Sequence, residues 1–151
     1  MDINPDLSLN YLVDNITLFP IIGQKGTIMT GIDSLKIGES LILKDIYFEF
    51  NKSNLLSESF PVLNQLAKYL KDKSKVHLQI IGHTDNVGSN LYNLNLSMNR
   101  ARSVVDYLAS QGIEITRLEY DGKGASQPIS TNESAKGQQK NRRVEIKLIK
   151  R

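Results

Sequence analysis

The sequence predicts an α+β fold, a two-layer sandwich in which helices cover one face of a four-stranded mixed sheet. Two observations support this. Three segments carry apolar residues at every second position, as strands do, and two segments between them carry apolar residues at helical spacing. Their order is β-α-β-α-β-β, with a long loop before the last strand. Such an order favours helices packed on a sheet, with right-handed crossovers.

The first strand is predicted over Leu41–Phe50. Ile46, Phe48 and Phe50 fall on one of its faces, and Tyr47 and Glu49 fall on the other. A break at residues 51–54 separates this strand from the first helix.

Ser57 or Ser59 is expected to cap that helix, and Pro61 fits its first turn, where a missing N–H is tolerated. A buried stripe is expected from apolar residues at helical spacing. Its members are Leu63, Leu66, Ala67 and Leu70.

The second half of the chain has the same order, a strand followed by a helix. A strand over Val76–Ile81 leads into the polar loop 82–88, and a helix runs from Ser89 or Asn90 to Gln111, where Gly112 provides the stop. The expected buried face of this helix consists of Leu94, Ser97, Ala101, Val104, Val105 and Leu108. A short strand over Ile115–Tyr120, a long loop with several turn formers, and a strand containing Val144, Ile146 and Leu148 complete the chain.

Residues 1–38 show no helical spacing of apolar residues and are predicted to be an extended or β lead-in from a larger parent protein. Within them, Ile16–Phe19 and Thr27–Thr30 favour strands. Residues 39–151 are expected to form the folded domain. Met1–Asn10 is polar and acidic and lacks the features of a secretory signal, so the chain is either cytosolic or an excised piece of an exported protein.

Composition excludes several classes of function. The 151 residues contain no cysteine, which rules out disulfides, thiolate metal sites and a cysteine nucleophile. No long apolar run predicts membrane insertion. The net charge of +3 comes mostly from scattered basic residues, which favours a solvated surface over nucleic-acid binding.

Asp85 and Arg100 are the main candidates for binding chemistry. Asp85 lies in a loop after a strand, and Arg100 shares a helix face with Asn93 and Leu96, spaced i, i+3, i+7. A carboxylate beside a guanidinium suits the ammonium and carboxylate of a free amino acid end, because the arginine fork can take a carboxylate with two parallel hydrogen bonds. The alternative is an ordinary ion pair that holds the loop to the helix.

Catalytic and metal chemistry find little support. His77, His83 and Asp85 could contribute to a zinc site. However, His83 and Asp85 lie only two positions apart at the end of a strand, and no further ligand has suitable spacing, so a structural histidine is favoured. No hydroxyl nucleophile lies in a suitable turn, and loop 82–88 lacks the ending of a phosphate loop. We therefore expect no enzyme activity, no cofactor and no metal.

Four blocks of this sequence, in order over residues 39–151, resemble the OmpA-like C-terminal domain. The central block matches the pattern T-D-x-x-G-x-x-x-x-N-x-x-L-S-x-x-R-A. Its residues here are Thr84, Asp85, Gly88, Asn93, Leu96, Ser97, Arg100 and Ala101. The other blocks are the aromatic strand 46–51, the Gly-x-Gly loop with a later proline at 122–128, and N-R-R-V-E at 141–145.

The resemblance implies non-covalent binding of peptidoglycan through the diaminopimelate of its stem peptide. It assigns the ligand contacts to Asp85 and Arg100, with further positions around them. These are Asn93, Leu96, Thr84, Asn86, Phe48 and Arg142. Arg142 has a second interpretation, as a surface arginine on an edge strand. The family often has an acidic residue where this chain has Asn51, which changes the local electrostatics.

The resemblance also implies a periplasmic location at the outer membrane, where the domain would anchor a parent outer-membrane protein to the wall. Three other functions remain open. The same fold could bind a protein partner, or serve as the wall-binding part of a motor stator. A wall amidase would need a metal or a nucleophile dyad.

Overall fold

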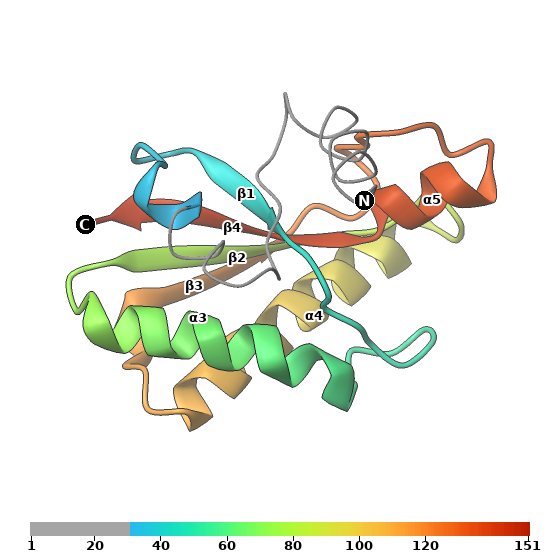
Figure 1. Cartoon of the computed structure of the whole chain (residues 1–151). Helices are drawn as coiled ribbons and strands as arrows, with labels where there is room; N and C mark the ends of the chain where they lie inside the picture. Colours follow the sequence, from blue (N-terminus) through green and yellow to red (C-terminus); the bar gives the residue numbers. More distant parts are fainter. Residues whose placement is uncertain (1–30) are drawn as a thin grey trace, which may run out of the picture.

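The computed structural model describes residues 31–151, which form a mixed sheet with helices packed on one face (Figure 1). The elements in chain order are β1 (Ser40–Leu43), the 3₁₀ turn η1 (Ser57–Ser59), α3 (Phe60–Asp72), β2 (His77–His83), α4 (Asn90–Ser110), the 3₁₀ turn η2 (Ile115–Arg117), β3 (Leu118–Gly122), α5 (Ala135–Asn141) and β4 (Arg143–Lys150). The strand order is β1-β4-β2-β3, and only β2 and β3 are paired in parallel. The predicted α+β fold class is confirmed.

The core lies between the sheet and the helices α3 and α4. Its strand residues alternate along the chain, as predicted, because every second side chain points to the helices. The alternating apolar residues of β2 and β4 and the predicted stripe of α3 are at most 4% exposed. They are Leu63, Leu66, Ala67, Leu70, Leu78, Ile80, Val144, Ile146 and Leu148.

The first strand is shorter than predicted. β1 ends at Leu43, and Asp45 then adopts a left-handed φ of 64°, which breaks the alternation. Phe48 forms only an isolated bridge to Leu55, and it packs on the core from a loop. Phe50 is 88% exposed, so the prediction that it shares a strand face with Phe48 is wrong.

The first helix begins at Phe60, with Pro61 in its first turn as predicted. Ser59 precedes it but does not cap it with its side chain. Its Oγ instead accepts from the backbone N–H of Tyr47 at 2.7 Å and donates to the Tyr47 carbonyl at 3.0 Å. The hydroxyl therefore holds the loop before the helix rather than the helix end.

α4 has the predicted ends. Ser89 caps it by accepting from Tyr92 N, and Gly112 follows with a φ of 102°. Its buried face is the predicted one except at one position. Leu94 is 40% exposed, and Asn93 is buried in its place.

Two elements near the C-terminus differ from the prediction. Residues 115–117 form the turn η2, so β3 starts only at Leu118 and reaches Gly122. The predicted long loop contains α5, whose N-cap Ser134 accepts from Gly137 N. This helix buries only Gly137 and Asn141, so it has no apolar stripe from which it could be predicted.

The described end of the predicted lead-in packs on the sheet. Ile32 is fully buried, Gly38 N donates to the Leu148 carbonyl, and Arg151 donates to the carbonyls of Ile32 and Leu35. The strands predicted at 16–19 and 27–30 lie outside the described residues, and the boundary at residue 38 stays a prediction. Within residues 31–151, every helix is too short or too polar to cross a membrane.

Arg117 is far from α3 in the sequence but stabilises the C-terminal end of this helix by direct hydrogen bonds. Its side chain donates to the carbonyls of Leu70, Lys73 and Val76 at 2.7–3.1 Å, and the residue is 8% exposed. Two of these carbonyls lie at the C-terminal end of α3, where helix geometry leaves acceptors without partners. The guanidinium supplies the missing donors and a favourable charge.

We expect Arg117→Ala to lower the free energy of unfolding by about 3 kcal/mol or more, because it leaves buried carbonyls without donors. Arg102→Ala is the matched control, since Arg102 makes only an exposed ion pair with Asp106. That change should stay within about 0.5 kcal/mol of the native value. Urea denaturation measures both, and equal losses would contradict this role of Arg117.

A charged cluster is buried on the sheet face opposite the core. Arg143 Nε lies 2.7 Å and His83 Nε2 lies 3.5 Å from Glu145 Oε2, and Ser40 Oγ donates to Oε1 at 3.3 Å. Burial raises the pKa of the Glu145 carboxyl, but the interactions with His83 and Arg143 outweigh it and lower the pKa to about 2. Glu145 is therefore ionised in the folded protein at neutral pH.

A carboxyl whose pKa is lowered by folding stabilises the protein above its unfolded pKa. That contribution is lost as the pH falls toward the folded pKa, here between about 4.5 and 2. We expect the stability of the native chain to drop more between pH 5 and pH 3 than that of Glu145→Gln. Glu119→Gln, an exposed carboxylate beside Gln79, is the control and should follow the native curve. Parallel curves for native and Glu145→Gln would refute this account.

Candidate ligand-binding site

Close packing of α4 on two strands determines where the candidate site lies. A Cβ atom added to Gly82 would lie 2.2 Å from the Ser97 carbonyl oxygen, and one added to Gly122 would lie 2.3 Å from Met98 N. Ser97 Oγ also accepts from Gly124 N at 2.9 Å. The first half of α4 is thereby held against the ends of β2 and β3, beside the loop that carries Asp85.

The loop from Thr84 to Gly88 has a fixed conformation. Thr84 N donates to the Gly124 carbonyl, and Thr84 Oγ1 donates to the Asp85 carbonyl at 2.7 Å. Asp85 Oδ1 accepts from Val87 N at 3.0 Å, and Gly88 adopts a φ of 97°. One carboxylate oxygen of Asp85 thus holds the loop, and the other, Oδ2, points to a different partner.

That partner is Arg142. Arg142 Nη1 donates to Asp85 Oδ2 at 2.5 Å, and the Arg142 side chain is 43% exposed. Asp85 itself is buried, with only 8% of its surface exposed. Both Asp85 and Arg100 are described, and no ion pair joins them, so the alternative of a simple Asp85–Arg100 bridge does not hold in this structure.

Arg100 is held from two sides. Its Nε donates to the Lys52 carbonyl at 2.9 Å, and its Cζ lies 5.0 Å from the centroid of the Phe48 ring. Within residues 31–151, its two Nη atoms have no hydrogen-bond partner. The end of the guanidinium that can take a carboxylate in a fork is therefore available.

Arg100, Arg142 and Asp85 share one electrostatic environment. Burial lowers the pKa of Arg100 from its usual value, and the charge of Arg142 adds to this lowering, whereas Tyr92 and Asp85 oppose it. An arginine remains protonated under these conditions. One carboxylate thus lies among two guanidiniums, which leaves the site with a net positive charge.

The remaining predicted residues differ in how they could contact a ligand. Asn93 is 2% exposed, and its Nδ2 has no partner among the described residues, an uncommon state for a buried donor. Leu96 is half-buried, and Asn86 is exposed. Thr84 is buried, with its hydroxyl engaged by the loop. Phe48 lies under the Arg100 guanidinium.

Two residues near Arg100 escaped the sequence-based prediction. Lys52 contributes a backbone carbonyl, which carries no signal of residue type. Tyr92 is 44% exposed and interacts electrostatically with Arg100. Its exposed position in the first turn of α4, next to the Asp85 loop, is the signal that could have indicated it.

In the described part of the chain, no serine or threonine hydroxyl is hydrogen-bonded to a histidine. Residues 31–151 also contain no group of three or more His, Asp or Glu side chains placed to hold a metal ion.

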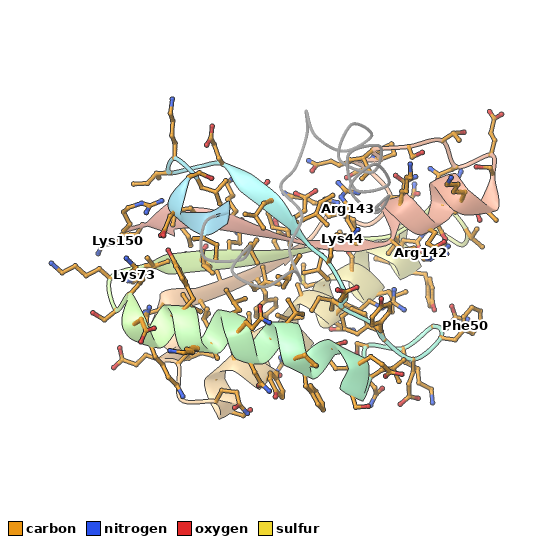
Figure 2. All side chains as sticks on the ribbon, viewed as in Figure 1. Lys44, Phe50, Lys73, Arg142, Arg143 and Lys150 are labelled. Carbon is orange, nitrogen blue, oxygen red and sulfur yellow. The ribbon has the colours of Figure 1, made fainter. Side chains whose placement is uncertain are left out.

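Figure 2 shows Arg142 at the end of the molecule opposite to Lys73 and Lys150, so the site occupies one end of the sandwich.

Comparison with known proteins agrees with this architecture. The chain is 40% identical over 105 residues to the outer membrane protein A of Bordetella avium, covering 70% of this chain and 54% of that protein. It is 34% identical to the probable lipoprotein YiaD of Escherichia coli, covering 79% of this chain and 56% of that protein. The chain thus spans about half the length of these relatives.

Solved structures share the fold. The cell wall anchor of the type VI secretion system of Pseudomonas aeruginosa matches with a TM-score of 0.63 at 30% identity, over 74% of this chain and 80% of that one. The peptidoglycan-associated lipoprotein of Burkholderia pseudomallei matches with a TM-score of 0.62 at 28% identity, over 70% of this chain and 88% of that one. The sequence profile of the OmpA family matches residues 47–142, and the chain belongs to the OmpA family.

Proposed function

We propose that this domain binds peptidoglycan without cleaving it, through the diaminopimelate of the stem peptide. The observation that carries the proposal is the free Nη end of Arg100 beside the buried carboxylate of Asp85. Two structural relatives, a cell wall anchor and a peptidoglycan-associated lipoprotein, support a wall ligand. Relatives named as outer-membrane proteins support a periplasmic location at the outer membrane, where the domain would anchor a parent protein.

Each pole of the ligand has a partner in this arrangement. The amino acid end of diaminopimelate carries an ammonium and a carboxylate on one carbon. The carboxylate would take both Nη atoms of Arg100, whose orientation is already set by Lys52 and Phe48. The ammonium would bind Asp85 Oδ2, which Arg142 occupies in the free protein.

Arg142 can leave this position because the ligand ammonium replaces its charge beside Asp85. Its guanidinium is partly exposed, so water can solvate it once the ion pair with Asp85 opens. After moving, its charge would still lie near the ligand carboxylate. Competition with Arg142 limits the affinity of a single site, which we expect in roughly the micromolar to millimolar range. A polymer with repeated stem peptides would raise the effective affinity through avidity.

Arg100→Ala should weaken binding to purified sacculi at least about tenfold, because a charge-assisted carboxylate contact is lost. Arg102→Ala, two residues further along the same helix and exposed, should bind like the native chain. Asp85→Asn should also lose binding, since an amide is a poor partner for an ammonium. Pull-down with sacculi measures all three, and native retention by Arg100→Ala would disprove the proposed site.

The choice of diaminopimelate is tested by two tripeptides that differ in one carboxylate. L-Ala–γ-D-Glu–meso-diaminopimelate carries the complete amino acid end, whereas the variant with L-lysine at the third position carries only the ammonium. We expect the first to compete with sacculi and the second to compete at least about tenfold less well. Equal competition by both would show that the wall is recognised through another group.

A further inference from the structure

Phe50 is the most exposed of the large hydrophobic side chains in residues 31–151, with 88% of its surface accessible. A single exposed apolar side chain is common on protein surfaces, so the position of Phe50 relative to the candidate site carries the argument. Figure 2 shows Phe50 at the same end of the molecule as Arg142, projecting from the loop between β1 and α3. Phe50 belongs neither to the core nor to the half-buried residues packed against it, so packing of the domain does not explain its position.

The backbone around Phe50 is held firmly although its ring is free. Lys52 N donates to the Glu49 carbonyl at 3.0 Å, which closes a four-residue turn with Phe50 and Asn51 at its corner. Asn51 has a φ of 57°, a conformation that asparagine tolerates better than most residues. Glu49 N donates to the Asn54 carbonyl, which ties the two arms of the loop together.

This turn is also attached to the candidate site. Arg100 Nε donates to the carbonyl of Lys52, two residues after Phe50, and the guanidinium lies over the ring of Phe48, two residues before it. The guanidinium that would hold the peptide thus fixes both sides of the turn that presents Phe50. A ligand bound at Arg100 and extending outward past Lys52 would pass this ring.

We infer that Phe50 is a second contact of the same site, a platform on which a pyranose ring of the glycan strand stacks. This inference rests on the proposed function, because the glycan is the part of peptidoglycan to which the stem peptide is joined. The C–H groups on one face of a pyranose carry partial positive charge and suit the negative face of an aromatic ring. A pre-positioned ring binds such a ligand with little loss of conformational freedom.

The test compares two probes, the tripeptide L-Ala–γ-D-Glu–meso-diaminopimelate and the same tripeptide joined to the disaccharide N-acetylglucosaminyl-N-acetylmuramic acid. We expect the native chain to bind the disaccharide-peptide about three- to tenfold more tightly than the tripeptide. Phe50→Ala should abolish this difference and leave the Kd for the tripeptide unchanged. Phe50→Trp should retain the difference, and calorimetric titration gives each Kd.

Ile115→Ala is the matched control, since Ile115 is 55% exposed and lies before β3, at the opposite end of the sheet. It should preserve both affinities. The inference is overturned if Phe50→Ala keeps the native ratio of the two Kd values, or weakens both probes equally. If the native chain binds the tripeptide but gains nothing from the sugars, the platform is refuted and the peptide site stands. If it binds neither probe, the proposed function itself is wrong, and the platform is refuted with it.

Discussion

The contact between α4 and the bare backbone of β2 and β3 is the constraint on which the rest of the site depends. Gly82 and Gly122 leave no side chain between helix and strands, so the helix backbone lies directly on the sheet. This contact sets the distance between Arg100, on the helix, and the Asp85 loop, which continues β2. The proposed binding groups therefore lie on a helix and on a loop held by hydrogen bonds, which favours a preformed site.

The electrostatics of the free site follow from that placement. Asp85 is buried, and a buried carboxylate needs a partner, which Arg142 provides. The Arg100 guanidinium is stabilised without an ion pair to Asp85, because the Lys52 carbonyl accepts from it and the Phe48 ring lies against it. In the free protein, Asp85 is thus paired with Arg142, which water can also solvate. The Nη atoms of Arg100 remain available for an anion.

Much of this arrangement could be predicted from the sequence, because it depends on local patterns. Alternation and helical spacing placed the core, and the loop after β2 brought Asp85 near the helix face of Arg100. The partner of Asp85 could not be predicted, since Arg142 is 57 positions away and its approach depends on the pairing of β4 with β2. The turn at Phe50 was also missed, because alternation continues past Asp45, where the backbone leaves the strand.

We propose that Asp85 and Arg100 hold the two poles of one amino acid end. A crystal structure of the domain with the diaminopimelate tripeptide tests it most directly. We expect the ligand carboxylate at the Nη atoms of Arg100, its ammonium at Asp85 Oδ2, and Arg142 moved from its position in the free protein. A tripeptide bound elsewhere, with the Asp85–Arg142 ion pair unchanged, would contradict it.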